Sequence, residues 1–354
     1  MGPGAPCGEA RLGGLDLARV LAAEAVMAYH FTAAERGLWP EPVNTLMPEA
    51  ALVTRFGAYG VDMFFVLSGY VILMANWDRR PVAFARARVA RLYPTYWSAL
   101  AVALLVYLVL WPGRSAVTVE GVAANVTMLQ TALGFADITT PQWTLWVELR
   151  FYLVFGCFLA WGATRERLAW LIALWAPIAG IAERSGFDFL ATVLVAPYAP
   201  LFACGMGLYA MKRWRQWPVF GVLVAGNAAL ACAWPGSARR EAVIAGTHNL
   251  NAVSGAASCA AVLICVGVIA FAANLPAWGW LSAAARLAGP SYALYLVHEP
   301  LGGWVIHILS GDLGVSIALA GAVAASSLVA WMIWRFVDRP AVPALRRLLS
   351  KRGG

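Results

Sequence analysis

The chain has 354 residues, of which 61% are apolar and only 12% are charged, and its mean hydropathy is +0.70. Soluble domains are nearer about half apolar and a quarter charged, so this composition excludes an ordinary soluble fold. The net charge of +8 does not indicate a nucleic-acid partner, because the basic residues cluster in loops between apolar runs. The six cysteines are scattered without metal-ligand spacing, so we expect no metal site.

Apolar runs long enough to cross a bilayer, which takes about 20 residues as a helix, recur along the chain. They predict an all-α, polytopic transmembrane helix bundle that forms a single integral-membrane domain over residues 1–354. Ten spans are expected, near residues 15–33, 56–77, 95–112, 143–161, 168–183, 190–211, 217–234, 250–272, 289–309 and 314–336. The first run carries charges and no small-residue cleavage site follows it, so we expect it to remain as a helix and not to be removed as a signal peptide.

Basic residues are distributed unevenly between the two sets of loops. One set, with the C-terminal tail, carries Arg79, Arg80, Arg86, Arg88, Arg91, Arg165, Arg167, Lys212, Arg213, Arg215, Arg346, Arg347, Lys351 and Arg352. The opposite loops carry only Arg36, Arg55, Arg114, Arg184, Arg239 and Arg240. The positive-inside rule therefore predicts that both termini are cytoplasmic.

The first expected span, "LDLARVLAAEAVMAYHF", contains Asp16, Arg19, Glu24 and His30. A charged side chain at mid-depth costs on the order of 2.5–3.5 kcal/mol on insertion scales, so such residues normally face the bundle interior or a water-filled cavity. Arg19 and His30 project from one helix face, because their spacing is three turns plus about 20°, or roughly 16 Å along the axis. Alternatively, Arg19 snorkels to the headgroups and His30 bonds a neighbouring helix. Histidine is also the commonest general base.

Three later spans carry further titratable residues. Asp62 in the second span could orient His30 or form a structural ion pair with an arginine. Glu148 in the fourth span could orient His30 or bond a sugar hydroxyl. His298 in the ninth span precedes Pro300, which breaks the local helical hydrogen bonding. It is a candidate second active-site residue or a packing histidine, since a broken helix at depth is tolerated where it lines a cavity.

Three neighbours of these residues are interpreted structurally. Ser68 is followed by Gly69, which favours close helix packing over a nucleophile role. Glu148 and Arg150 are two positions apart and point to different sides of a helix, so we expect them not to pair. Trp143 is an interfacial anchor or a stacking surface for a sugar ring.

Several motifs follow one another in a fixed order. They are the Arg19-x10-His30 spacing, "GAYGVDMFFVLSGYVI" at 57–72, "FARARVARLYPTYW" at 84–97, "QWTLWVELRFYL" at 142–153, "SYALYLVHEPL" at 291–301 and "FVDRPAVPALRR" at 336–347. The series resembles the acyltransferase-3 family, which comprises integral-membrane O-acyltransferases of mostly bacterial origin. The resemblance covers nearly the whole chain.

The resemblance implies transfer of an acyl group, expected to be acetyl, from a cytoplasmic acyl-CoA to a hydroxyl of a glycan, glycolipid or related exported metabolite. Acyl-CoA is then a co-substrate, no cofactor is tightly bound, and the bilayer is a bacterial inner membrane. Many members modify polysaccharides, often by O-acetylation. The family's Arg-x10-His residues fall on Arg19 and His30, its Arg-x-x-Arg pair on Arg88 and Arg91, and its acidic position on Glu148.

Arg86, Arg88 and Arg91 form a basic cluster at the start of the third span, where guanidinium groups suit the phosphates of coenzyme A. Positive-inside topology and anionic lipid would require the same residues. With the resemblance, we expect this cluster and Arg19 to bind the donor.

The chain departs from the family pattern in two places. Leu149 and Arg150 follow Glu148 where members often carry a second acid, and the late Glu-Arg-Pro motif is replaced by Asp338-Arg339-Pro340. The first departure bears on any role that needs two adjacent carboxylates.

Three classes of function are compatible with the composition. The first is an O-acyltransferase in which His30 removes the hydroxyl proton, Glu148 or Asp62 orients its ring, and His298 assists; a covalent acyl-histidine is a variant of it. The second is a transporter or flippase of a polar lipid-linked metabolite, although the internal repeat typical of transporters is not found. The third is a structural partner of a glycan-assembly complex, against which the titratable residues argue. Turnover of acyl-CoA without a gradient distinguishes the first two.

The arginine distribution predicts that residues 78–94 and the C-terminus are cytoplasmic. Single cysteines introduced at positions 80 and 350 of a cysteine-free variant should not react with an impermeant thiol reagent in intact cells, but should react after lysis. Labelling of intact cells at either site would contradict this orientation.

Overall fold

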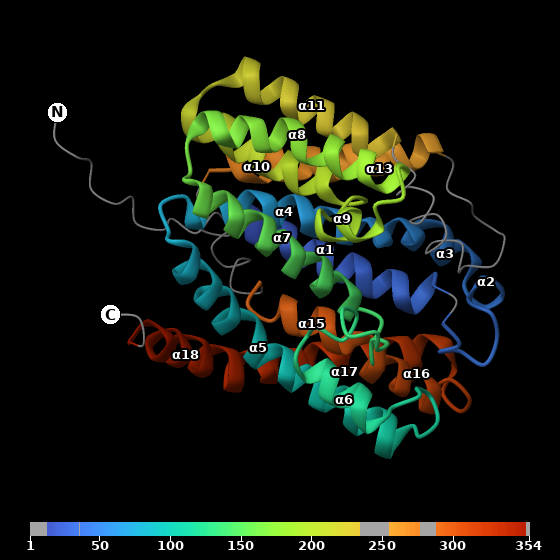
Figure 1. Cartoon of the computed structure of the whole chain (residues 1–354). Coiled ribbons are helices and arrows are strands. Elements are labelled where there is room, and N and C mark those ends of the chain that lie inside the picture. The colour runs from blue at the N-terminus through green and yellow to red at the C-terminus, as the bar shows by residue number, and fades with distance from the viewer. Residues whose placement is uncertain (1–12, 35, 234–254, 277–287, 352–354) are drawn as a thin grey trace.

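The computed structural model describes residues 13–34, 36–233, 255–276 and 288–351. Within these ranges all regular structure is helical, which confirms the predicted all-α class, and most helices run along one common direction (Figure 1). The principal helices are α1 (Gly13–Thr32), α3 (Pro48–Thr54), α4 (Gly60–Asn76), α5 (Pro81–Leu105), α6 (Val119–Val126), α7 (Gln142–Trp161), α8 (Arg165–Arg184), α9 (Asp188–Val193), α10 (Ala199–Trp214), α11 (Trp217–Ala233), α13 (Gly255–Asn274), α15 (Ser291–Val297), α16 (Gly303–Leu309), α17 (Gly314–Ile333) and α18 (Arg339–Lys351). Shorter helical turns are α2 (Val43–Leu46), η1 (Arg55–Tyr59), η2 (Val106–Leu110), η3 (His298–Gly302) and η4 (Trp334–Asp338).

Each expected span coincides over much of its length with a helix, although residues 250–254 of the eighth lie outside the described ranges. Five helical stretches are long and apolar enough to cross a bilayer: Pro48–Asn76, Pro81–Leu110, Gln142–Trp161, Gly255–Asn274 and Gly314–Leu349. Helix α1 is not among them, because it carries three charged residues. These stretches fit an integral membrane protein, and the total of ten spans stays a prediction.

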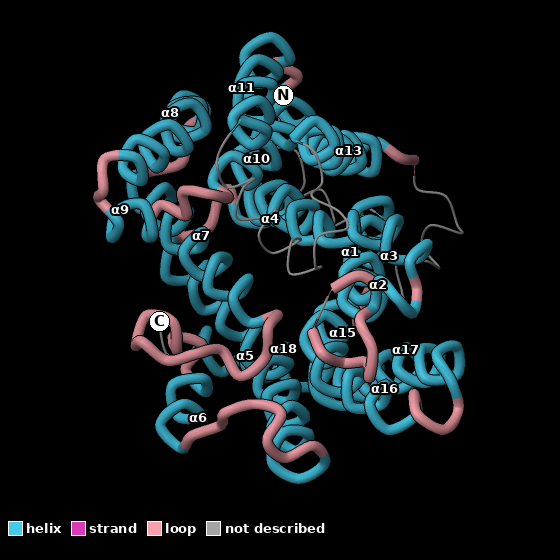
Figure 2. The backbone as a smooth tube through the Cα atoms, turned by 90° about the vertical axis from the view of Figure 1, so that its right-hand side faces the viewer, coloured by secondary structure: helices cyan, strands magenta, loops and turns pink. Residues whose placement is uncertain are grey.

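Helix α1 lies in the middle of the bundle, between two groups of helices (Figure 2). On one side it packs against α4 and α13, and α4 packs in turn against α10, which contacts α8 and α11. On the other side it packs against α15, which contacts α17 and α5. Because α1 is covered from both sides, His30 is buried among other helices, whereas Glu24 lies on an exposed part of the helix.

Helices α4 and α10 approach each other until backbone meets backbone. A Cβ atom on Gly69 would lie 2.1 Å from the carbonyl oxygen of Phe202, and one on Gly205 would lie 1.9 Å from that of Val66. No side chain fits at either position, which confirms the packing role predicted for Gly69. This contact fixes α4, the helix that carries Asp62, within the bundle.

The helix that carries His298 widens into a π-helical turn. Helix α15 ends at Val297, the turn η3 contains Pro300, and α16 continues the same rod. Pro300 has no N–H to donate, and a π turn accommodates the missing bond without ending the helix. The expected break at Pro300 is therefore a local widening, a feature found often at functional sites.

The α4–α10 contact predicts that Gly69→Ala and Gly205→Ala each lower the unfolding temperature. Overpacking typically costs about 1–3 kcal/mol, and the atoms that would be struck are backbone and cannot swing aside. Thermal unfolding in detergent, followed by tryptophan fluorescence, measures the effect. Gly226→Ala in α11 is the matched control, because its Cβ would meet nothing within 4 Å. Equal unfolding temperatures for Gly205→Ala and Gly226→Ala would contradict the prediction.

Candidate active site

Two histidines from opposite parts of the chain meet in the interior. His30 Nδ1 lies 2.7 Å from His298 Nε2, and the two rings are stacked with centroids 5.0 Å apart. Both residues are buried, with exposed fractions of 7% for His30 and 0% for His298. The structure therefore joins the first helix to the turn η3 through a direct bond between two candidate catalytic residues.

The hydrogen-bond partners fix which nitrogen of each ring carries the proton. His298 Nδ1 lies 3.1 Å from the carbonyl oxygen of Leu294, which can only accept, so Nδ1 is the donor. In a neutral His298, Nε2 is then an acceptor, and His30 Nδ1 must donate to it. In this tautomer a neutral His30 carries no proton on Nε2, which is the state required of a general base.

A small cavity of about 50 Å³ adjoins His30 and is called here the histidine cavity. It is lined by Val26, Tyr29, His30, Arg36, Ala58, Tyr59, Val61, Asp62, Thr140, Trp143, Tyr198 and Tyr295. Aromatic side chains dominate this lining, and Asp62 and Arg36 add one group of each charge. Such a lining offers flat apolar surface and hydrogen-bonding groups to a small polar molecule next to the imidazole.

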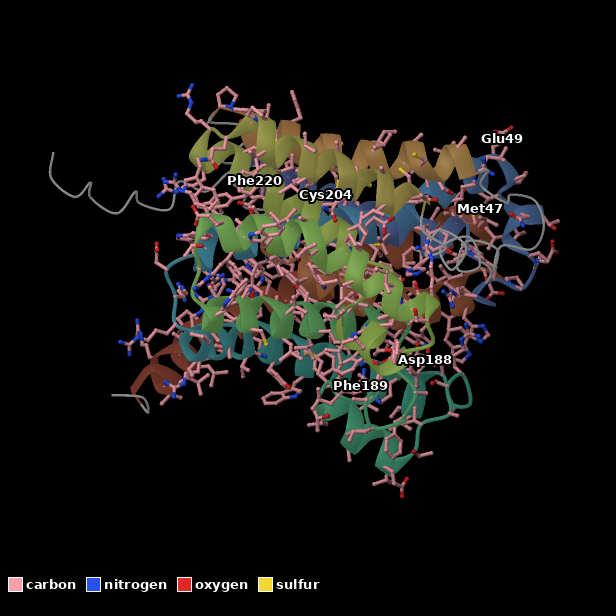
Figure 3. All side chains as sticks on the ribbon, turned by 45° about the horizontal axis from the view of Figure 1, so that its top comes forward. Met47, Glu49, Asp188, Phe189, Cys204 and Phe220 are labelled. Atoms are coloured by element: carbon pink, nitrogen blue, oxygen red, sulfur yellow. The ribbon has the colours of Figure 1, made fainter. Side chains whose placement is uncertain are left out.

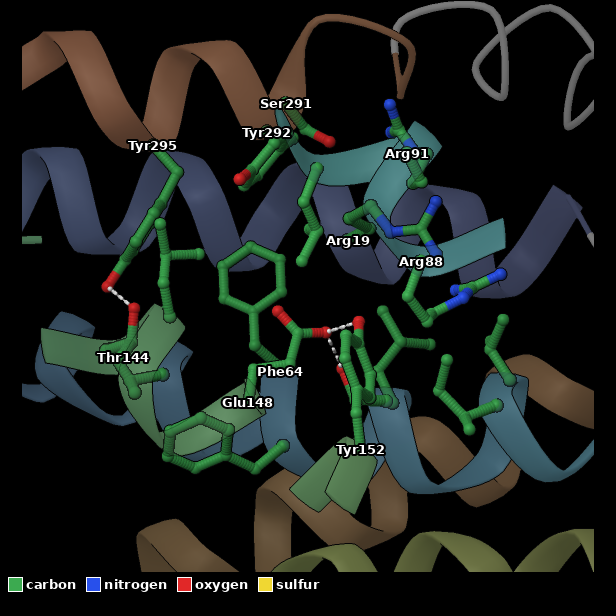
Figure 4. A pocket seen from close by; sticks show the side chains of 18 residues that line it. Arg19, Phe64, Arg88, Arg91, Thr144, Glu148, Tyr152, Ser291, Tyr292 and Tyr295 are labelled. Atoms are coloured by element: carbon green, nitrogen blue, oxygen red, sulfur yellow. Dashed lines mark hydrogen bonds between the residues drawn. The ribbon is translucent and has the colours of Figure 1, made fainter. Parts of the chain in front are cut away.

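A second cavity, of about 160 Å³, adjoins Arg19 on the same helix and is called the arginine cavity (Figure 4). Arg19, Arg88 and Arg91 gather at one end of it and Tyr295 and Thr144 lie at the other, as the close-up view shows. The Nε atom of Arg88 is buried and has no hydrogen-bond partner among the described residues. An unpaired buried donor is costly, so it marks a position where a ligand acceptor would be stabilised.

A third cavity, of about 280 Å³, continues the arginine cavity toward α18 and is called the basic mouth. Arg19 and Arg91 line both. The other charged residues of the basic mouth are Asp16, Asp338, Arg339 and Arg346. The three cavities form a series that follows α1 from the basic mouth to His30, over a helical rise of roughly 16 Å from Arg19.

Glu148 and Asp62, both expected to orient His30, lie in different cavities. Asp62 shares the histidine cavity with His30, whereas Glu148 lines the arginine cavity. The Oε1 atom of Glu148 accepts hydrogen bonds from Tyr152 at 2.5 Å and from Ser68 at 3.3 Å. The residue that bonds the ring of His30 is His298 and not Glu148.

The arginines of the basic cluster also differ from one another. Arg91 Nη1 lies 2.8 Å from both carboxylate oxygens of Asp338, and Thr95 donates to the same carboxylate at 3.1 Å. The Cζ atom of Arg88 lies 5.9 Å from the ring centroid of Tyr152, and the side chain lines the arginine cavity. Arg86 lines none of the three cavities as far as the chain is described. Arg91 thus already has a counter-charge, and Arg88 is the arginine with an unmet donor.

Arg150 points away from Glu148, as its spacing predicted. Its side chain donates to the carbonyl oxygens of Trp146 and Thr192, at 3.2 and 2.5 Å. The arginine therefore ties α7 to α9 and does not pair with the acid in its own helix.

Two interactions near the histidine pair were not predicted from the sequence. Glu299 accepts hydrogen bonds from the backbone N–H of Thr140 at 3.1 Å and from its hydroxyl at 2.8 Å. The hydroxyl of Tyr295 bonds Thr144 Oγ1 at 2.9 Å. Both connect the α15–η3 segment to the start of α7. The "SYALYLVHEP" motif contained Tyr295 and Glu299, but no spacing rule indicates partners about 150 residues away.

The described residues contain no group of three or more His, Cys, Asp or Glu side chains arranged to hold a metal ion. Among the described cysteines, Cys232 and Cys265 donate hydrogen bonds to the carbonyl oxygens of Cys259 and Tyr59, at 3.7 and 3.4 Å. Cys7 lies outside the described ranges.

The fold and the buried histidine pair define a helical membrane protein with an internal polar site. Residues 12–335 match the acyltransferase-3 family, described as an acyltransferase domain, so the chain belongs to that family. It is 28% identical to acyltransferase MdmB of Streptomyces mycarofaciens, over 97% of this chain and 93% of that protein. It is also 28% identical to the exopolysaccharide production protein ExoZ of Rhizobium meliloti (strain 1021), over 84% of this chain and 92% of that protein. No solved structure matches significantly. The family membership supports an acyltransferase activity.

The Arg91–Asp338 pair predicts that Arg91→Ala destabilises the fold. Losing charge-assisted bonds costs about 1.5–3 kcal/mol. It also leaves the Asp338 carboxylate, which is 11% exposed, with the hydrogen bond from Thr95 in place of its counter-charge. The double variant Arg91→Ala/Asp338→Ala should recover part of the loss, because no unpaired carboxylate remains. Thermal unfolding measures both. Arg79→Ala, at an exposed position, is the control. If Arg91→Ala and Arg79→Ala have the same unfolding temperature, the Arg91–Asp338 ion pair does not hold α5 to η4.

Proposed function

We propose that the protein is an acyl-CoA-dependent O-acyltransferase. It transfers an acyl group, with acetyl as the expected one, to a hydroxyl of a glycan, glycolipid or related exported metabolite. The observation that carries this proposal is the 2.7 Å hydrogen bond between His30 and His298, beside a cavity that adjoins a second cavity lined by arginines. Family membership supports the acyl transfer, and the name of the ExoZ relative supports a polysaccharide-related acceptor.

The reaction follows from the tautomers of the two histidines. A hydroxyl is a poor nucleophile until a base takes its proton, and His30 Nε2 is that base. The hydroxyl oxygen attacks the thioester carbonyl, a C–O bond forms, the C–S bond breaks, and the proton passes through His30 to the sulfur of the departing CoA. No covalent enzyme intermediate is needed.

His298 positions His30 in this scheme. By accepting from His30 Nδ1 it fixes the orientation of the imidazole at the histidine cavity, and it stabilises the imidazolium that forms when His30 takes a proton. The carbonyl oxygen of Leu294 holds His298 in turn. A carboxylate is the more usual partner in such a relay. A neutral histidine stabilises the charge less and leaves His30 a weaker base.

The donor is proposed to enter at the basic mouth. Coenzyme A carries several phosphate charges, and guanidinium groups bind phosphate with a planar fork. Arg339 and Arg346 would contact the nucleotide end of CoA, and Arg19 and Arg88 the phosphates or carbonyls nearer the thioester. In this scheme Arg91 acts mainly through its pair with Asp338. A cytoplasmic donor requires the basic mouth to face the cytoplasm, in agreement with the predicted orientation in a bacterial inner membrane.

The acceptor is proposed to bind against the wall of the histidine cavity, with only its reacting hydroxyl beside His30. Trp143 and Tyr198, whose ring centroids lie 5.6 Å apart, offer a flat apolar surface to a sugar ring. Asp62 can accept a hydrogen bond from a neighbouring hydroxyl, which would orient the reacting one toward His30.

Substitutions of Arg88 and of His30 should have different effects, the first on donor binding and the second on the rate of transfer. Arg88→Ala is expected to weaken acetyl-CoA binding about ten- to a hundredfold, the equivalent of losing one charge-assisted bond to phosphate. His30→Ala is expected to leave that affinity within a few-fold but to lower the rate of acetyl transfer by about 10²- to 10⁴-fold, the typical worth of a general base. Calorimetry measures the affinity, and release of the CoA thiol with methyl glycosides as acceptors measures the rate.

His307→Ala is the control for both assays, because His307 is exposed and stacks on Trp111 away from the site. It should retain the wild-type rate and affinity. A folded His30→Ala protein with more than about a tenth of the wild-type rate would assign the base to another residue, His298 being the next candidate. If Arg88→Ala binds acetyl-CoA as tightly as the wild type, Arg88 does not contact the donor and serves only the membrane topology.

A further inference from the structure

Two residues belong to both the arginine cavity and the histidine cavity. Val61 projects from α4 and Tyr295 from α15, and each lines both cavities. They therefore lie at the boundary between the part of the protein proposed to hold the donor and the part that holds His30. An acyl group delivered from the arginine cavity to His30 must cross this boundary.

The ring of Tyr295 is held in position from two sides. Thr144 Oγ1 lies 2.8 Å from the carbonyl oxygen of Pro141, to which its hydroxyl proton is donated. Thr144 must then accept from Tyr295, so the 2.9 Å bond between them runs from the tyrosine to the threonine (Figure 4). Phe64 packs edge-on against the tyrosine ring with centroids 5.6 Å apart. The ring also contacts His298, with centroids 6.1 Å apart, so displacing it would break one hydrogen bond and two ring contacts.

Val61 is also rigid. A β-branched side chain on a helix has one strongly preferred rotamer, so its two methyl groups cannot turn away from the boundary without cost. Beyond the boundary the histidine cavity has only about 50 Å³, room for a few water molecules, which the acyl group would share with the acceptor hydroxyl. The boundary restricts the width of the acyl group, and the cavity restricts its length.

We propose that Val61 and Tyr295 select the acyl group by its width, so that the protein transfers short unbranched acyl groups and discriminates against groups branched next to the carbonyl. This inference rests on the proposed function, because it assumes a thioester donor in the arginine cavity. A branched acyl group carries two carbons side by side at the level of the carbonyl, where a linear one carries a single carbon. The branched group therefore needs more room beside Val61 and Tyr295, and a protein interior feels a difference of one methyl group.

The test uses butyryl-CoA and isobutyryl-CoA, which have the same atoms and differ only in branching. Both are offered together to the protein in lipid nanodiscs, one of them deuterated, with methyl β-glucoside and water as acceptors. Mass spectrometry follows the loss of each acyl-CoA thioester, and a separate reaction with acetyl-CoA alone gives the basal rate. The wild type should consume the linear isomer at least about tenfold faster, as expected for one misplaced carbon in a tight site. Val61→Ala should bring the ratio to within about threefold of unity.

Val71→Ala is the matched control. Val71 lies on the same helix and lines the arginine cavity but not the histidine cavity, and the substitution removes the same two methyl groups. It should leave the isomer ratio of the wild type unchanged, whatever it does to the rate. Tyr295→Phe keeps the ring and removes the bond to Thr144, so it should lower the ratio less than Val61→Ala does. An equal response to Val61→Ala and Val71→Ala, or an isomer ratio near unity in the wild type, would overturn the assignment.

A second measurement separates this inference from the proposed function. Unreactive thioether analogues, S-butyl-CoA and S-isobutyl-CoA, are tested for binding by thermal stabilisation. Turnover or binding of CoA compounds without any isomer preference leaves the proposed function standing and rejects the boundary as a selector. Absence of binding by every CoA compound, together with absence of acetyl transfer, rejects the proposed function and this inference with it.

Discussion

A polar group buried in an apolar helix bundle must find a partner inside the protein, because neither lipid nor water supplies one. Three such pairs organise this molecule: His30 with His298, Glu299 with Thr140, and Arg91 with Asp338. Each pair joins segments that are far apart in the chain. The first holds α1 against η3, the second holds η3 against the start of α7, and the third holds α5 against η4. Titratable side chains therefore hold together the helices around the cavities, and side chains of this kind can also act as acids, bases or ligands there.

The π turn at η3 sets the position of His298 and, through the backbone, the nitrogen of its ring that carries the proton. Pro300 prevents a regular α-helix through this segment, and the widened turn carries His298 and Glu299 side by side into the interior. One turn earlier, Leu294 supplies the carbonyl oxygen that fixes the His298 tautomer. In the proposed scheme, the tautomer of His30 is therefore set by a backbone group of another helix and not by a residue near His30 in sequence. The tight glycine contact between α4 and α10 holds the opposite wall, from which Val61 and Asp62 project.

Helix periodicity explains which features were predictable. The eleven-residue spacing of Arg19 and His30 predicted one interior face, and Arg19 lines the arginine cavity while His30 lines the histidine cavity. Periodicity assigns a face to a residue but does not identify the helix opposite. His298, 268 positions from His30, could be named as a candidate but not as its partner. For the same reason Arg91 resembled an unpaired phosphate ligand, although Asp338 neutralises it.

The separation of the two cavities bears on what crosses the membrane in the proposed reaction. If the phosphates of CoA or a hydroxylated sugar moved past Val61 and Tyr295, their polar groups would lose water and find no partners there. Burying each unpaired polar group costs on the order of several kcal/mol. A short acyl group has one carbonyl and a few apolar atoms, so its passage loses least. The cheapest route to acylate an acceptor on the far side is therefore to keep the phosphates of CoA on the side of the basic mouth. The thioester sulfur then reaches the boundary, and only the acyl group crosses it. His30 lies beyond that boundary, in the histidine cavity, where a hydroxyl can meet the acyl group without either substrate leaving its own side.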